Sequence, residues 1–115
     1  MATLTSLGTT SINGLKLGAL AAASVAGDDF VNNGNSLLIV ANAHVGDPRT
    51  ITIHSVQVCD TGALEHDQDV VVPASSTAYI YGFVPKRWNA SSTQKVSITY
   101  SDAAADVTVG YVVIG

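Results

Sequence analysis

The fold is decided by residues 95–114, KVSITYSDAAADVTVGYVVI, which contain two stretches of alternating side chains. In the first stretch, Val96, Ile98 and Tyr100 alternate with polar residues. In the second, Val107 begins a series of apolar residues at every other position. Alternation with a period of two is typical of a β-strand that buries one face. The segment therefore predicts two successive half-buried strands.

Earlier segments continue the β pattern. Residues 37–41, LLIVA, are apolar at consecutive positions, which predicts a central strand covered on both faces. Residues 50–53, TITI, alternate and place their two isoleucines on one side. Residues 70–72 and 78–83 add two further short strands. With turn residues between six or seven such runs and no helical period, the chain is predicted to be an all-β, single antiparallel β-sandwich.

Two local features are predicted within these strands. Val56 and Val58 have the opposite parity from Ile51 and Ile53, so one extra residue at His54-Ser55 would restore the buried face. This pattern predicts a β-bulge at that position. Further along, the residues Tyr79, Tyr81 and Phe83 alternate strictly and are expected to fill the sandwich core.

The chain has 115 residues, which fits one domain. Residues 1–14 have no periodicity and are predicted to form a flexible, extended N-terminal arm, followed by a β-sandwich domain over residues 15–115. The Ala-rich stretch 15–25 fits either two helical turns or an extended segment across the end of a sheet. Both readings of this stretch stay open.

Composition narrows the classes of partner. Apolar residues make up 47% of the chain, charged residues 12%, and the formal net charge is −4. This balance of apolar and charged residues excludes a disordered chain. Nucleic acid is not expected as a partner, because phosphate binding needs clustered cations and only Lys86 and Arg87 are adjacent. No apolar run reaches the ~18 residues needed to cross a membrane, so no membrane partner is expected. A surface with so few charges suggests one that is largely covered in use.

The densest group of potential metal ligands is Glu65-His66-Asp67-Gln68-Asp69. Carboxylates and one imidazole can hold a divalent cation, which would allow a metal-dependent enzyme built on His66, Asp67 and Asp69. The spacing matches no known metal motif, so a solvated acidic loop is the preferred interpretation.

No other pattern predicts catalysis. His44 and His54 stand alone, and His54 is expected to supply a hydrogen bond at the bulge. The chain has no GxSxG elbow and no phosphate-binding glycine loop, and Cys59 is its only cysteine. We therefore predict that the protein is not an enzyme and has no catalytic residue, cofactor or metal.

Trp88 lies in the loop Pro85-Lys86-Arg87-Trp88-Asn89 and either caps the core or anchors a partner. Aromatic side chains are favoured where proteins bind sugars and other proteins. An alternative function is therefore a carbohydrate-binding or adhesin module that uses Trp88 with Tyr79 or Tyr81 as a stacking platform.

Several segments in order along residues 28–110 carry a resemblance to a known family. These segments are Asp29-Phe30-Val31-Asn32-Asn33-Gly34, Leu38-Ile39-Val40-Ala41-Asn42, Thr50-Ile51-Thr52-Ile53, Val72-Pro73-Ala74, Val96-Ser97-Ile98-Thr99-Tyr100 and Val107-Thr108-Val109. In this order the chain resembles the head decoration, or cement, proteins of tailed bacteriophages.

The resemblance implies a jelly-roll-like sandwich, commonly a homotrimer, on the outer capsid surface of the virion. Its expected partners are the major capsid protein and further copies of itself. We expect partner contacts from Leu4, Leu7 and Ile12 of the arm and from Trp88. In this reading the protein decorates and stabilises the capsid without catalysing a reaction.

Overall fold

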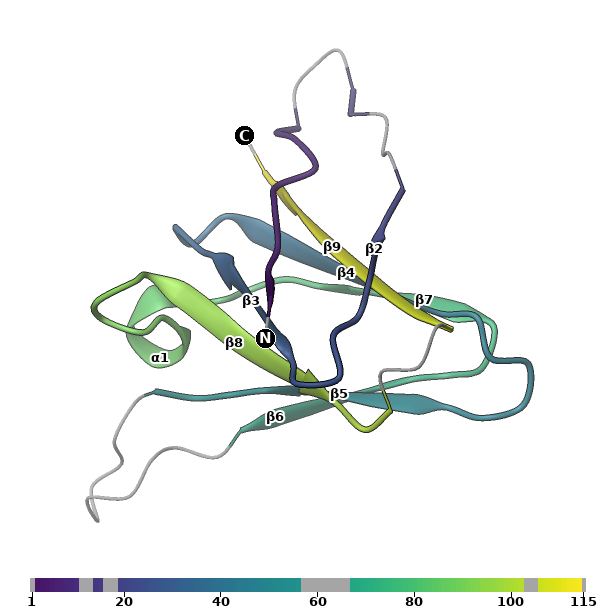
Figure 1. The fold of residues 1–115 in the computed structure, drawn as a ribbon. Coiled ribbons are helices and arrows are strands. Elements are labelled where there is room, and N and C mark those ends of the chain that lie inside the picture. The colour runs from purple at the N-terminus through teal and green to yellow at the C-terminus, as the bar shows by residue number, and fades with distance from the viewer. Residues whose placement is uncertain (1, 11–13, 16–18, 57–66, 103–105, 115) are drawn as a thin grey trace.

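Alternating side chains build two facing β-sheets in the computed structural model, which describes residues 2–10, 14–15, 19–56, 67–102 and 106–114 (Figure 1). The first sheet has the order β1 (Ala2–Thr3), β3 (Asp28–Val31), β8 (Lys95–Tyr100), β5 (Arg49–Ile53) and β6 (Gln68–Val72). The second has the order β2 (Ala21–Ala22), β9 (Val107–Val113), β4 (Ser36–Asn42) and β7 (Ser76–Ile80). A short helix, α1 (Pro85–Trp88), lies beside β8.

The predicted all-β sandwich is confirmed. All pairings between the described strands are antiparallel, except the short β1–β3 pair, which is parallel. From β3 to β9 the chain passes repeatedly from one sheet to the other, and only the step from β5 to β6 stays within a sheet. This repeated crossing between sheets is jelly-roll-like.

The core lies between the sheets and is centred on Phe30. The Phe30 ring meets the ring of Phe83 edge-on at 5.3 Å between centroids and lies 5.1 Å from the ring of Tyr111. Inward-facing residues of the paired strands surround these rings. The largest fully buried apolar side chains are Phe30, Leu38, Ile51, Ile53, Ile98, Val40, Val72, Val96, Val107 and Val109.

Strand β4 is covered on both faces, as its apolar run predicts. Leu38 and Val40 belong to the core between the sheets, whereas Ile39 points to the outer face and is still only 3% exposed. Ile39 pairs with Gly110 of β9, and a Cβ placed on Gly110 would lie within 3 Å of side-chain atoms of Leu7 and Leu20. Leucines from the N-terminal part of the chain therefore cover this outer face.

The N-terminal arm is extended and hydrogen bonded to both sheets. Leu4 N–H donates to the carbonyl of Asp29 at 2.8 Å, and Leu7 N–H donates to the carbonyl of Tyr111 at 2.9 Å. The Leu4 side chain is 7% exposed and belongs to the core cluster. In this structure residues 2–10 therefore form part of the sandwich (Figure 1).

The Ala-rich stretch, which the sequence left open between helix and extended chain, is extended where it is described beyond residue 18. Ala21 and Ala22 form β2, which pairs with Val109 and Thr108 of β9. Residues 16–18 lie outside the described part of the chain, as does Ile12 of the arm.

The expectation that Tyr79, Tyr81 and Phe83 share the core is wrong for the two tyrosines. Tyr79 is 65% exposed and Tyr81 is 56% exposed, whereas Phe83 is buried. Strand β7 ends at Ile80, and Gly82 then adopts a φ of 99°, which side-chain-bearing residues rarely adopt. This backbone turn changes the phase of the alternation, so only Phe83 reaches the interior.

The predicted bulge at His54-Ser55 is also wrong. Ser55 is buried, so the inward alternation of Ile51 and Ile53 continues without an extra residue. Val56 falls on the outward positions of this alternation and is 38% exposed. Its N–H donates to the carbonyl of Arg87 at 2.8 Å. Val58 lies outside the described residues.

Two glycines with nearly the same backbone angle provide a test of this fold. Gly27 has a φ of 97° and Gly82 a φ of 99°. A Cβ on Gly27 would lie 2.6 Å from the carbonyl oxygen of Ile98, whereas a Cβ on Gly82 would meet nothing within 4 Å. Gly82→Ala is expected to lower the free energy of unfolding by about 1–2 kcal/mol through backbone strain alone. Gly27→Ala should lower it by at least about 3 kcal/mol, because strand β8 must also move.

Urea unfolding followed by the fluorescence of Trp88, the only tryptophan, measures both losses. Equal losses in the two variants would contradict the close approach of Gly27 to β8.

Candidate functional site

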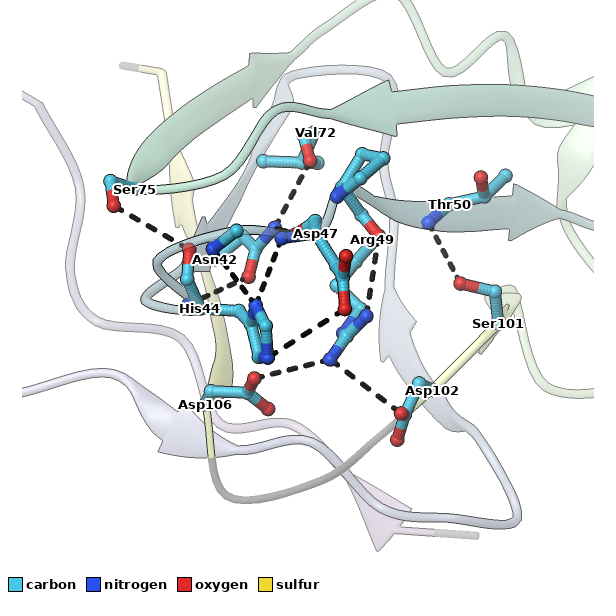
Figure 2. Close-up of polar contacts among 12 residues, drawn as sticks. Asn42, His44, Asp47, Arg49, Thr50, Val72, Ser75, Ser101, Asp102 and Asp106 are labelled. Atoms are coloured by element: carbon cyan, nitrogen blue, oxygen red, sulfur yellow. Dashed lines mark hydrogen bonds and ion pairs between the residues drawn. The ribbon is translucent and has the colours of Figure 1, made fainter.

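Three connections meet at one end of the sandwich, those between β4 and β5, between β6 and β7, and between β8 and β9 (Figure 2). Asn42 at the end of β4 joins the first two. Its side-chain amide donates to the carbonyl of Asp47 at 2.9 Å and to the carbonyl of Val72 at 3.2 Å. Its side-chain oxygen accepts from the N–H of His44 at 3.0 Å. Asn42 is 2% exposed, so these bonds fix the β4–β5 loop against the end of β6 in the protein interior.

His44 closes the β4–β5 loop. Its Nδ1 accepts from the N–H of Gly46 at 3.1 Å and from the N–H of Asp47 at 2.9 Å. An atom that accepts two N–H groups carries no proton, so in the neutral ring the proton is on Nε2. Nε2 lies 3.8 Å from Oδ2 of Asp47. Through these bonds to Nδ1, His44 organises the β4–β5 loop.

Arg49 occupies the centre of this end of the molecule. Its side chain is 12% exposed, and its Nη2 lies 3.3 Å from Oδ2 of Asp106 and 3.6 Å from Oδ2 of Asp102. These two carboxylates flank the β8–β9 connection, so one guanidinium joins it to the start of β5 (Figure 2). The arrangement is a structural clamp, since its one cation is shared between two acids.

A second polar group lies on the outer face of the first sheet. Nδ1 of His54 lies 2.9 Å from Oδ2 of Asp67, and its Nε2 lies 2.8 Å from Oγ1 of Thr99. With Asp67 ionised, Nδ1–H donates to the carboxylate and Nε2 of the neutral ring accepts from the Thr99 hydroxyl. The expected hydrogen-bonding role of His54 is confirmed.

This acid–imidazole–hydroxyl order also occurs in the triads of hydrolases. A triad acts in a cleft with donors for an oxyanion. Three cavities in the described part of the chain are lined by other residues. Asp67 also accepts the N–H of Ser55 at 2.8 Å, so the group ties the end of β5 to β8 and to the start of β6.

Of the predicted acidic cluster, Glu65 and His66 lie outside the described residues, as does Cys59. Asp67 and Asp69 are each bonded to a side chain of the β5 segment, Asp67 to His54 and Asp69 to the Thr52 hydroxyl at 2.8 Å. Among the described residues, no group of three or more His, Cys, Asp or Glu side chains is placed to hold a metal ion.

The sequence-predicted partner contacts fall in different places. Leu4 and Trp88 are core residues, 7% and 8% exposed. Leu7 is half-buried over β9, and Ile12 lies outside the described residues. Of the three described residues, Leu4 and Trp88 are buried and Leu7 is half-buried, so they do not form one exposed surface, and the partner contacts of all four residues stay predictions.

Trp88 caps the core. The Arg87 guanidinium lies over its ring at 4.4 Å from the centroid, which covers the ring from solvent. Its loop is held by Asn32, whose amide donates to the carbonyl of Phe83 at 2.8 Å and to the Asn89 side-chain oxygen at 2.7 Å. The Asn89 amide in turn donates to the carbonyl of Asn32. A stacking platform for a sugar therefore does not include Trp88 in this structure.

The exposed aromatic surface is formed instead by Tyr79 and Tyr81. Tyr79 lies on the outer side of β7, where it pairs with Ile39 of β4, and Tyr81 follows directly after the end of the strand. Strand β7 is last in its sheet, so its other edge has no hydrogen-bonded strand among the described residues. The sequence interpretation missed this surface because it continued the strand through residue 82. The available signal was that this residue is a glycine, which tolerates the positive φ that it adopts here.

The chain matches no known family model, no curated protein and no solved structure. The only helix in the described residues has four residues, and no described helix is long and apolar enough to cross a membrane.

The Arg49 clamp can be tested by removing its charge. Arg49→Met is expected to lower the free energy of unfolding by about 1–3 kcal/mol, because Asp106, with a side chain 21% exposed, loses its cation. Lys86→Met removes an exposed cation and should change it by less than about 0.5 kcal/mol. Adding Asp106→Asn to Arg49→Met should restore part of the loss. Urea unfolding measures all three variants, and equal effects of the two single changes would contradict the clamp.

Proposed function

We propose that this protein is a structural component of a bacteriophage virion that binds capsid subunits and further copies of itself and catalyses no reaction. The observation that carries the proposal is the exposed pair formed by Tyr79 on the edge strand β7 and Tyr81 just after it, at 65% and 56% exposure. The order of strand segments along residues 28–110, which resembles head decoration proteins, supports the choice of a capsid as partner.

The chemistry of the β7 surface suits a protein partner. Tyrosine is enriched at the centres of protein interfaces, because its ring buries a large area and its hydroxyl still forms a hydrogen bond. Strand β7, with the sequence STAYI, contains no charged residue, so docking there removes no ionised side chain of the strand from water. Beyond the strand, Val84 adds another apolar side chain at 58% exposure.

The described charges are largely committed to the protein itself, which supports a neutral docking surface. Arg49 is paired with Asp102 and Asp106, and the Arg87 guanidinium covers Trp88. Association through β7 would therefore depend mainly on buried apolar area and directional hydrogen bonds. Such an interface weakens little with added salt.

A carbohydrate-binding module remains the second candidate, and the same tyrosines favour it. Tyr79 and Tyr81 are two residues apart and both are exposed at the end of β7. Two such rings can stack on successive apolar patches of a glycan chain. A cavity of about 520 Å³ beside α1 offers amide groups, but those of Asn32 and Asn89 are bonded to each other.

The tyrosine surface is tested by the double variant Tyr79→Ala/Tyr81→Ala in co-sedimentation with capsid shells assembled from the major capsid protein of the same genome. Affinity should fall at least about tenfold, since two exposed aromatic anchors are removed. The free energy of unfolding should change by less than about 1 kcal/mol, because neither ring is buried.

The matched control is Val71→Ala, which truncates an exposed apolar side chain on β6, the edge strand of the other sheet. Its capsid affinity should equal that of the wild type. Failure of the wild-type protein to sediment with the shells would overturn the capsid proposal. Binding of a glycan array by the wild type, abolished in the double variant, would then favour the carbohydrate alternative.

Self-association has its own measurement. Light scattering coupled to size exclusion should give a mass about three times the 11.8 kDa of one chain, as expected for the trimer that the resemblance implies. A mass of one chain over the micromolar range would contradict the self-association part of the proposal and leave capsid binding to be judged separately.

A further inference from the structure

A cavity of about 290 Å³ opens between the N-terminal arm and β2, at one edge of the sandwich. Its walls are mainly apolar and include Leu4 and Leu7 from the arm, Ala21 and Ala22 from β2, and Val109 from β9. This volume is near the lower end for ligand sites, so the cavity suits a short aliphatic group.

One charged side chain also lines this cavity. Asp28, the first residue of β3, is fully buried and shares the inward-facing parity of Phe30, so it points between the two sheets. It is among the residues that line the cavity. The nearest register partner of Asp28 on the arm is Ala2, which lines the same cavity.

The hydrogen bonds of the Asp28 carboxylate are all on one oxygen. Oδ2 accepts from the Tyr100 hydroxyl at 2.6 Å and from the N–H of Ser24 at 3.1 Å. Oδ1 is buried and has no partner. Leaving an acceptor of a buried carboxylate unpaired is costly, and no described residue supplies a donor to Oδ1.

The neighbouring tyrosine acts as a donor to Asp28 at physiological pH. Burial raises the pKa of the Tyr100 hydroxyl well above its ordinary value, and the hydrogen bond to Asp28 and the charge of that carboxylate raise it further. Tyr100 therefore keeps its proton, and no described side chain neutralises Oδ1. Lys95 lies on β8, the strand that pairs with β3, but it is bonded instead to the Thr3 hydroxyl at 3.3 Å.

From this geometry we propose that the cavity binds a primary ammonium group on a short aliphatic chain. The ammonium donates to Oδ1 of Asp28, and the aliphatic part packs against Leu4, Leu7 and Val109. The chemistry fits a free alkylamine or the lysine side chain of another polypeptide, and the site does not depend on capsid binding.

The alternative occupant is trapped water. A buried water needs two to four polar partners. Apart from Asp28, the side chains that line the cavity are apolar except for the hydroxyls of Thr3 and Thr5. A water there would satisfy Oδ1 but leave the apolar walls in contact with a polar molecule, whereas an alkylammonium satisfies both.

The test is a titration followed by NMR amide shifts, with n-butylammonium chloride, Nα-acetyl-lysine N-methylamide and neutral n-butanol as probes. At least one of the two ammonium compounds should bind at least about tenfold more tightly than butanol, and shift Leu4, Ala22 and Gly110. Preference for butylammonium indicates a free amine, and preference for the lysine derivative indicates a polypeptide side chain. Equal binding of butanol and the ammonium probes, or no saturable shift with any probe, would overturn the proposal.

Asp28→Asn removes the charge and keeps an oxygen that can accept from Tyr100 and Ser24. Ammonium binding should weaken at least about tenfold in this variant. The control Asp47→Asn removes an exposed acid at the three-loop end of the molecule and should leave the affinity unchanged. If Asp28→Asn does not fold, the comparison of butanol with the ammonium compounds on the wild-type protein still decides the matter.

Discussion

The structure depends on covering both faces of the β4–β9 pair. The inner faces of these strands contribute Leu38, Val40 and Val109 to the core, as in any sandwich. The outer faces also carry apolar residues, of which Ile39 is 3% exposed and Val112 only 2% exposed. Burying one such side chain is worth about 1.5–3 kcal/mol, so leaving this outer face in water would be expensive in a chain of this size. The arm and the stretch before β2 supply the cover through Leu7 and Leu20, and they can approach closely because Gly110 has no side chain.

Leu7 and Leu20 cover only part of the outer face of this sheet, so the outer side of β7 stays exposed. The leucines lie over β9, at one end of the Tyr79–Ile39–Gly110 row, while Tyr79 of β7 lies at the other end. Tyrosine is suited to this position because its ring can pack against an apolar neighbour while its hydroxyl stays in water. The same arrangement leaves an aromatic, uncharged edge exposed for a partner. Fold stability and the candidate docking surface are therefore two consequences of one incompletely covered sheet.

Much of the fold could be predicted from the sequence, because strand alternation is a local signal. The patterns at 37–41, 50–53, 95–100 and 107–113 each correspond to an observed strand. The pairing of the arm with β9 could not be predicted, since nothing in residues 1–14 encodes which distant strand accepts its hydrogen bonds. The positions of Tyr79 and Tyr81 were missed because a single glycine, Gly82, changes the phase of an otherwise regular pattern. His44 looked isolated in the sequence because its partners are the backbone N–H groups of its own turn.

Several of the few charged side chains of this protein are bonded to other parts of the same chain. In the described residues, Arg49 is held by Asp102 and Asp106, Asp67 is held by His54, and Asp28 is buried at the edge of the core. These charges join loops and strands to one another, where partial burial makes each interaction stronger than it would be in water. The outer side of β7 is then left with hydroxyl and aromatic groups, whose desolvation costs far less than that of an ion. Because these charges are bonded within the protein, the outer side of β7 can offer a neutral surface for association. That surface lies beyond the part of the sheet that Leu7 and Leu20 cover.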